Sequence, residues 1–242
     1  MALQSIYPFR YRAFTAELND SVSEIINIFE NREPKFWWNT LRRYSFRGSD
    51  FQQGEKVRIE FHARLSTCTD GELFDVANEI LAWGEMDPLN DTMKRDLRRS
   101  LDCLNLLARG ETVEITDLCV ERVASITKMY EMWDVGNWVI YDSYCARGLQ
   151  WLISGLWNSL AYRKHERLLK LPWPPGRIGF PVSGFPRMAD TAPNQKRLGF
   201  IYGSWLCKAI AERLTALQNN AFDWKPYHIE MLAFQLGHEV DK

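Results

Sequence analysis

Apolar residues recur every three or four positions along most of the chain, which is the pattern of amphipathic α-helices. Capping residues and glycines mark where several of these helices begin and end. The pattern predicts helices over Leu18 to Phe29, Glu72 to Trp83, Asp87-Pro88 to Gly110, from a cap at Thr116 or Asp117 to Gly136, Ser143 to Leu171, Gly199 to Leu217 and Pro226 to Leu236.

Strand-like alternation is confined to Val57 to Phe61 and Thr112 to Thr116, and neither stretch is long enough to build a sheet. Residues Leu171 to Arg197 contain six of the ten prolines and three glycines, which predicts one long, irregular loop. We therefore expect an all-α fold with a long Pro/Gly-rich loop. The chain is predicted to form a single domain over residues 1–242, with two helical lobes, 1–110 and 111–242, as a variant of this arrangement.

Composition narrows the class of protein. No uncharged apolar run approaches the roughly eighteen residues of a transmembrane helix, so no membrane partner is expected. The five cysteines are scattered without CxxC spacing, which favours a reduced, cytoplasmic protein over a disulfide framework. Glycine-rich phosphate loops, the GxSxG pattern and zinc-type histidine pairs are missing from the sequence, so we expect neither a cofactor nor a metal. The net charge of −1 means that any nucleic-acid site must be a local basic patch. We also expect a monomer.

Asp142 stands at a junction that decides the functional interpretation. It follows the apolar run Trp138 to Tyr141 and precedes the amphipathic segment that begins at Ser143. A carboxylate in this place either caps the helix or is a reactive group held at its positive end. From the residues alone, capping is the simpler interpretation.

The residues around Asp142 resemble the helix-hairpin-helix superfamily of DNA glycosylases, and within it the 8-oxoguanine glycosylase-like fold. In that family a helix, a turn and an apolar run lead to a catalytic aspartate that opens the next helix. The matching residues here are Met132-Trp133-Asp134, Trp138-Val139-Ile140-Tyr141 and Asp142-Ser143. The segment Trp224 to Phe234 also looks like the closing helix of bacterial proteins in this group. The resemblance implies a helix-hairpin-helix glycosylase-like helical domain.

Two departures from the family pattern qualify what the resemblance implies. The stretch Asp117 to Arg122 lacks the hairpin glycines that let backbone N–H groups approach a DNA phosphate, although Arg122 can supply a charge. Bifunctional members carry a nucleophilic lysine about eighteen or nineteen residues before the aspartate, where this chain has Ala124 and Val123. Lys128 stands 142 − 128 = 14 residues before Asp142. The resemblance therefore implies a monofunctional glycosylase that uses water.

The implied chemistry assigns roles to particular side chains. Asp142 would stabilise the oxocarbenium character of the deoxyribose and orient the attacking water. Lys128 would contact the extruded nucleotide or pair with Asp134 or Asp142, with a solvated lysine as the alternative. The base must leave the stack, so it needs aromatic walls. The ten tryptophans are about three times ordinary usage. Four of them and one tyrosine are candidates for these walls, although packing in the core is the simpler interpretation for each: Trp37, Trp38, Trp83, Trp133 and Tyr141.

The expected partner is double-stranded DNA that carries a modified base. The residues expected to contact its backbone are Arg42, Arg43, Arg47, Arg122 and Arg147. Two other basic clusters are alternatives that can also be solvated helix faces: Arg163, Lys164, Arg167 and Lys170, and Lys94, Arg95, Arg98 and Arg99.

The sequence therefore predicts a monofunctional DNA glycosylase that leaves an abasic site. The tryptophan excess suits a bulky base, and the bacterial proteins that the chain resembles include an anti-phage glycosylase that removes glucosylated hydroxymethylcytosine. Repair of oxidised purines such as 8-oxoguanine is the competing substrate class. A non-catalytic helical protein that binds DNA or a partner is the alternative from another class, and a structural module is a third.

Overall fold

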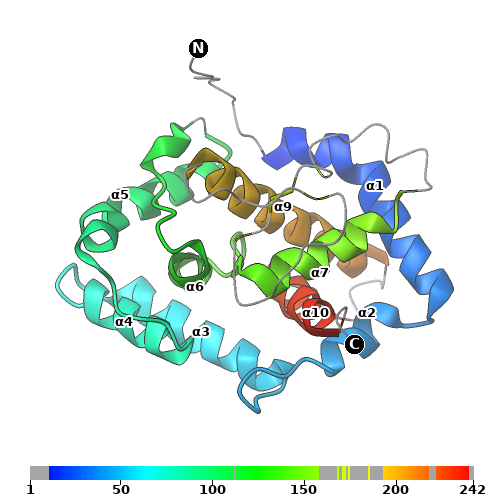
Figure 1. Ribbon diagram of the computed structural model, residues 1–242, viewed down its shortest axis with the longest axis horizontal. Helices are drawn as coiled ribbons and strands as arrows, with labels where there is room; N and C mark the ends of the chain where they lie inside the picture. Colours follow the sequence, from blue (N-terminus) through cyan, green and yellow to red (C-terminus); the bar gives the residue numbers. More distant parts are fainter. Residues whose placement is uncertain are drawn as a thin grey trace.

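The structure is a computed structural model that describes residues 11–111, 113–157, 168, 171–172, 174, 185, 193–217 and 222–239. The described chain is helical, with no strand beyond an isolated bridge between Phe46 and Ser49, so the all-α prediction is confirmed (Figure 1). Its helices are α1 (Tyr11–Arg32), α2 (Phe36–Arg42), α3 (Phe51–Thr67), α4 (Leu73–Trp83), α5 (Asp91–Ala108), the 3₁₀ turn η1 (Ile115–Asp117), α6 (Val123–Trp133), α7 (Ser143–Ser154), α9 (Pro193–Leu217) and α10 (Pro226–Glu239).

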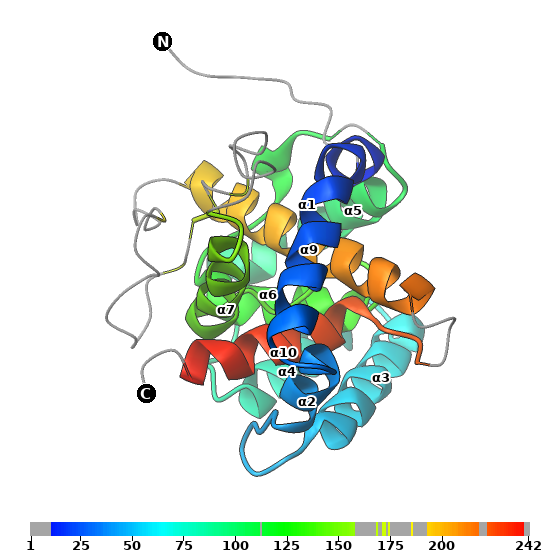
Figure 2. The same cartoon turned by 90° about the vertical axis from the view of Figure 1, so that its right-hand side faces the viewer.

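Helix α10 lies at the centre of the described helices, and α7 runs beside it (Figures 1 and 2). Helix α10 also packs against α2, α3 and α9, while α6 packs against α3, α4, α5 and α9. Helix α1 rests on α9 and α2. The contacts of α1 with α9 and of α2 with α10 therefore connect residues 1–110 with residues 111–242, the two stretches considered above as separate lobes. No described helix is both long enough and apolar enough to cross a bilayer.

Helices α7 and α10 approach so closely that their facing positions have no room for side chains. A methyl group on Gly148 of α7 would overlap the backbone carbonyl of Ala233 in α10. A methyl group on Gly237 of α10 would likewise overlap the carbonyl of Tyr144 in α7. These two glycines therefore set the distance between the central helices.

Replacing Gly148 by alanine is expected to lower the free energy of unfolding by about 1–3 kcal/mol, because the helices must separate to admit the methyl group. Helix propensity alone predicts the opposite sign, a gain of about 1 kcal/mol. Urea denaturation of Gly148→Ala measures the difference. The control is Gly71→Ala, where the nearest heavy atom to the new methyl is 4.0 Å away. An unchanged or higher stability for Gly148→Ala would contradict the close approach.

Helices α2 and α3 were not expected from the sequence, and the strand-like alternation over Val57 to Phe61 does not form an extended segment. These residues lie within α3, which Asp50 caps by accepting a hydrogen bond from Gln53 N at 2.9 Å. The buried positions of α3 follow helical spacing over a longer window: Phe51, Gly54, Arg58 and Leu65. An alternation over five residues is too short to distinguish the period of a strand, two residues, from that of a helix, about 3.6 residues.

Several predicted helix ends also need correction. Helix α5 begins at Asp91, capped by Asn90, rather than at Asp87-Pro88. Neither Thr116 nor Asp117 caps α6, since both lie in η1 and α6 begins after Arg122. No strand forms in the described part of Thr112 to Thr116. Helix α7 ends at Ser154 and not at Leu171.

Candidate functional site

Asp142 is the N-cap of α7, with extended backbone angles of φ −99° and ψ −177°. Its Oδ1 accepts a hydrogen bond from Cys145 N at 2.9 Å, and its side chain is partly exposed. Among the described residues, the other carboxylate oxygen has no hydrogen-bond partner. The carboxylate therefore caps the helix through one oxygen and leaves the second oxygen available to another group.

The residue before Asp142 is held on three sides. Tyr141 is wholly buried, and its backbone N–H donates to Thr127 Oγ1 of α6 at 3.0 Å. The Tyr141 hydroxyl donates to Pro172 O at 2.6 Å, and its ring lies against Gly203 of α9. These contacts fix the path of the chain into α7, but they also make Tyr141 a core residue rather than a wall of an open pocket.

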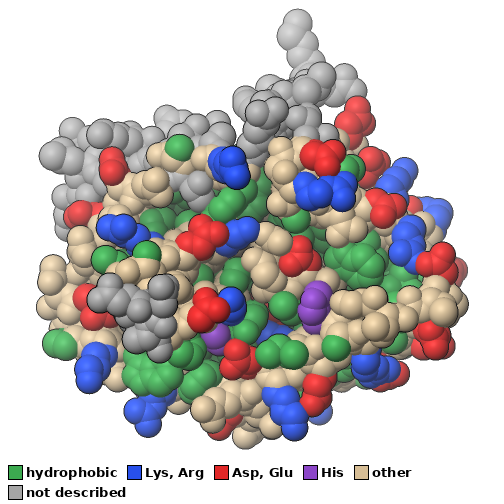
Figure 3. Space-filling view, turned by 180° about the vertical axis from the view of Figure 1, so that it is seen from behind, with side chains coloured by type: hydrophobic (Ala, Val, Ile, Leu, Met, Phe, Trp, Pro, Cys, Tyr) green, Lys and Arg blue, Asp and Glu red, His purple; other side chains and the backbone are tan. Residues whose placement is uncertain are grey.

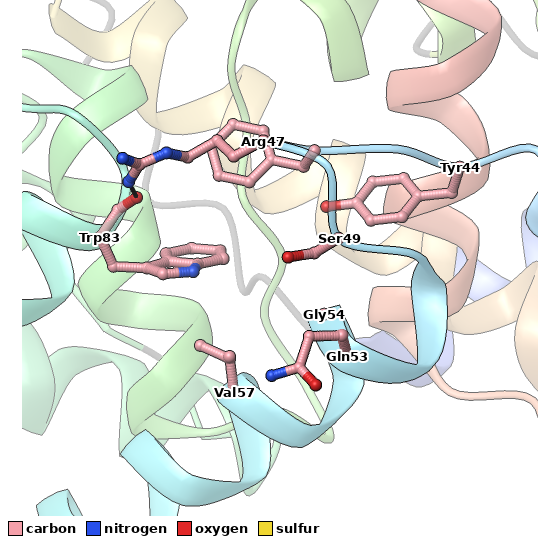
Figure 4. Close-up of a pocket in the computed structure, with 8 residues that line it drawn as sticks. Tyr44, Arg47, Ser49, Gln53, Gly54, Val57 and Trp83 are labelled. Carbon is pink, nitrogen blue, oxygen red and sulfur yellow. Dashed lines mark hydrogen bonds between the residues drawn. The ribbon is translucent and has the colours of Figure 1, made fainter.

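A pocket of about 250 Å³ opens between the turn before α3, the first turns of α3 and the end of α4 (Figure 4). Its walls are aromatic and its polar groups are amide, hydroxyl and guanidinium; the lining residues are Tyr44, Phe46, Arg47, Ser49, Gln53, Gly54, Val57 and Trp83. Figure 4 shows the Trp83 ring and the Tyr44 hydroxyl pointing into the pocket from opposite sides. The volume is just below the range of about 300–1,000 Å³ that is common for small-molecule sites, and suits one planar ring system.

Arg47 holds one edge of this pocket. It occupies a left-handed backbone conformation, with φ 54°, in the tight turn between Phe46 and Ser49. Its Nη1 donates to Trp83 O at 2.7 Å, and its Nε lies 3.1 Å from Glu85 Oε1. The arginine thereby ties the turn to the end of α4 and keeps the Trp83 side of the pocket in place.

One aromatic ring connects the pocket with the first turn of α7. The ring centroid of Phe234 in α10 lies 5.9 Å from that of Tyr44 and 5.9 Å from that of Phe46. It also lies 5.4 Å from that of Tyr144, two residues after Asp142. Phe234 therefore packs behind two lining residues of the pocket and also against the first turn of α7.

A buried ionic network lies behind the pocket. Arg58 of α3 is fully buried, and its guanidinium carbon is 5.6 Å from the ring centroid of Trp83. Its Nε lies 3.0 Å from Glu131 Oε2 of α6, and its Nη2 lies 2.6 Å from Glu230 Oε2 of α10. One guanidinium therefore joins three helices through two carboxylates that have almost no contact with solvent.

Burial and the neighbouring charges act on these groups in opposite directions. Burial raises the pKa of Glu230 and of Glu131, and Arg58 opposes the rise for both carboxyl groups. The charge of Asp142 further raises the pKa of Glu230, while that of Lys128 lowers it. Burial alone would lower the pKa of Arg58, but Glu131 and Glu230 raise it above its usual value. Asp142 and Lys128 thus border the same network.

Lys128 is buried in α6 rather than solvated. Its Nζ donates to Ala124 O at 3.1 Å, and its methylene groups pack where a side chain on Gly84 would stand. Its positive charge lowers the pKa of Glu131 as well as that of Glu230. Lys128 therefore acts as a counter-charge to the two buried carboxyl groups.

Of the aromatic side chains expected to form a base pocket, Trp83 lines the pocket described above. Trp37 is fully buried beside Phe29 and Phe36, while Trp38 is half-buried against Phe222. Trp133 donates through Nε1 to Asn105 Oδ1 at 3.0 Å. The structure thus separates these tryptophans and does not gather them around one cavity.

The arginines expected to contact DNA are also dispersed. Arg42 is exposed, Arg43 pairs with Glu239, and Arg147 is buried in α7. Arg122 donates to the carbonyls of Asp87 and Pro88. The four-residue cluster of Lys94 to Arg99 includes three arginines that pair with Asp70, Asp96 or Asp117. The alternative cluster of Arg163, Lys164, Arg167 and Lys170 lies outside the described residues.

Positive and negative side chains alternate over the face seen in Figure 3, where no large patch carries one sign. Clusters of histidine, cysteine or carboxylate side chains that could hold a metal ion are absent from the described residues.

The sequence interpretation missed Arg58, Glu131 and Glu230. A signal for two of them was present, because Glu131 and Glu230 interrupt otherwise apolar helical stretches, and charged residues in such places are usually paired. Arg58 was missed because Val57 to Phe61 alternates like a strand, and no helix was expected there.

Comparisons with protein-family models, with curated proteins and with solved structures give no match to this chain.

Proposed function

We propose that the protein is a monofunctional DNA glycosylase that extrudes a modified base and cleaves its N-glycosidic bond. The observation that supports this proposal is the Asp142 carboxylate, which caps α7 through Oδ1 and keeps its second oxygen without a partner among the described residues. The aromatic pocket supplies a place for a planar ring, and Phe234 packs between its lining residue Phe46 and Tyr144 in the first turn of α7.

In the proposed reaction the bond between the base nitrogen and the sugar C1′ breaks, and positive charge develops on the sugar. The second oxygen of Asp142 stabilises this charge and orients a water molecule that adds to C1′. The departing base takes up a proton and the water loses one, so the products are a free base and an abasic sugar. The base lies against Trp83 before and after cleavage.

The position of Lys128 supports a mechanism without a covalent amine intermediate. A lysine nucleophile must reach the sugar carbon with an unprotonated amine. Here the amine donates to a carbonyl of its own helix, and its charge lowers the pKa of the buried Glu131 and Glu230. We therefore assign Lys128 a structural part in the site and keep water as the nucleophile.

The size of the pocket bears on the choice of base. A cavity of about 250 Å³ suits a nucleobase alone better than a base that carries a sugar. An oxidised purine such as 8-oxoguanine would therefore fit within the pocket, whereas the glucose of glucosylated hydroxymethylcytosine would have to lie outside it. The anti-phage role proposed from the resemblance depends on the second of these substrates.

The test uses labelled duplexes that differ at one position, which holds 8-oxoguanine, glucosylated hydroxymethylcytosine, guanine or cytosine. We expect strand breaks at a modified base only after heating in alkali, and none in the unmodified duplexes. Reduction with borohydride should trap no covalent adduct. Binding without cleavage of any duplex would refute the enzyme and favour the non-catalytic DNA-binding alternative. A trapped adduct that disappears in Lys128→Met would contradict the use of water.

A further inference from the structure

We infer that Thr127 is a positioning residue that fixes the Asp142 carboxylate by tying the chain before α7 to α6. The inference rests on the proposed function, because its effect is read through the chemistry assigned to Asp142. Thr127 itself is fully buried and does not reach solvent.

The hydroxyl of Thr127 makes two hydrogen bonds whose directions are determined. It donates its proton to Val123 O, one turn earlier in α6, at 2.8 Å. Because the hydroxyl proton is used in this bond, the Thr127 oxygen acts as the acceptor for the backbone N–H of Tyr141, at 3.0 Å. One side chain thus links the α6 backbone to the residue immediately before Asp142.

This link fixes the orientation of the peptide plane between Ile140 and Tyr141, which lies one residue before Asp142. The Tyr141 side chain is already held by Pro172 O and by the α9 backbone at Gly203. Its backbone N–H is held by Thr127. Because Asp142 follows in an extended conformation, the orientation of the preceding backbone sets the direction in which its side chain leaves the chain. Cys145 N then holds Oδ1 from the helix side.

Without the Thr127 oxygen the Tyr141 N–H has no partner in a site closed to water, and the segment before Asp142 shifts to find one. A displacement of about 1 Å in a reacting group can reduce a rate about 100-fold. The loss should therefore appear in the chemical step and not in DNA binding, since Thr127 contacts no surface.

The chain contains a matched control in α5. Ser100 Oγ accepts Cys119 N at 2.9 Å and lies 2.8 Å from Asp96 O and 3.2 Å from Asp117 O, to either of which it can donate. As at Thr127, a helix hydroxyl thus fastens a following loop to its own helix. Its loop leads to the start of α6 and not to Asp142. Ser100→Ala therefore removes an equivalent buried link without disturbing the carboxylate.

The experiment measures kcat and KM for excision, well below the melting temperature of each variant, together with circular dichroism. We expect Thr127→Val to lower kcat about 10- to 100-fold with KM unchanged. Thr127→Ser, which keeps the hydroxyl, should retain kcat within about threefold of the wild type, and Ser100→Ala should retain it fully. If Thr127→Val does not fold, Thr127→Ala carries the same expectation.

Three results would overturn the inference while leaving the proposed function intact: full kcat in Thr127→Val, no recovery in Thr127→Ser, or an equal loss in Ser100→Ala, which would indicate general loosening. An inactive wild-type protein on every modified duplex would refute the proposed function itself, and the positioning role with it. The two failures are therefore distinguishable in one series of assays.

Discussion

Replacing Asp142 by asparagine is expected to lower the rate of base excision at least about 100-fold and to leave folding stability nearly unchanged. Asparagine caps helices about as well as aspartate, so its side-chain oxygen can still accept the Cys145 N–H. What the variant loses is the negative charge that would stabilise the sugar cation and orient water. The substitution therefore separates the capping of α7 from the proposed catalytic role, because asparagine keeps the first and loses the second.

The measurement compares excision under single-turnover conditions, DNA affinity and urea denaturation for three proteins. Asp142→Ala should lose excision and also about 1 kcal/mol of stability, since alanine cannot cap α7. Asp142→Asn should lose excision alone, with DNA affinity retained. If Asp142→Asn excises the base as fast as the wild type, the residue is a cap and nothing more, and the proposed mechanism is refuted.

Replacing Arg58 by leucine is expected to lower the free energy of unfolding by about 3–5 kcal/mol. Two carboxyl groups, those of Glu131 and Glu230, would remain buried without the guanidinium that joins them. Breaking one side of a buried ion pair costs this much because the remaining charge cannot return to water. The loss is a large part of the stability of a typical domain, about 5–15 kcal/mol.

The same helix supplies the control for this prediction. Arg64 of α3 forms a two-bond pair with Glu79, at 2.6 and 2.8 Å, but both side chains are about half exposed. Arg64→Leu should change stability by less than about 1 kcal/mol, because exposed ion pairs contribute little. Equal losses in the two variants would show that burial of the Arg58 network is not what makes it important.

The Arg58→Leu variant should also respond to pH with a definite sign. In the wild type, burial raises the pKa of Glu131 and Glu230, and Arg58 opposes the rise. Without Arg58 both pKa values rise further, so the folded state binds protons more readily than the unfolded chain, whose glutamates titrate near about 4.3. The variant then loses stability as the pH rises toward the raised pKa values of Glu131 and Glu230 in the folded state. It regains stability as the pH falls toward the pKa of glutamate in the unfolded chain. The stability gap between variant and wild type should narrow between neutral and mildly acid pH.

The helical class and the most regular helices could be predicted from the order of residues alone. The α5 stripe of Leu97, Leu101, Leu104 and Leu107 and the apolar face of α4 were readable because helical periodicity is a property of neighbouring residues. The N-cap at Asp142 was readable for the same reason, since a cap depends on a residue and the next turn.

Which of these residues line a pocket depends on how the helices pack. Trp37 and Trp83 belong to the same predicted set, yet the first is enclosed by Phe29 and Phe36 while the second borders a pocket. The segment around Arg58 lies in a helix, and its partners Glu131 and Glu230 come from two other helices that are distant along the chain. Helical periodicity and helix caps involve residues within about one turn of each other, so they can be predicted from neighbouring residues. Pockets and buried ion pairs join residues that are distant along the chain. Only the packing of the helices brings such residues together.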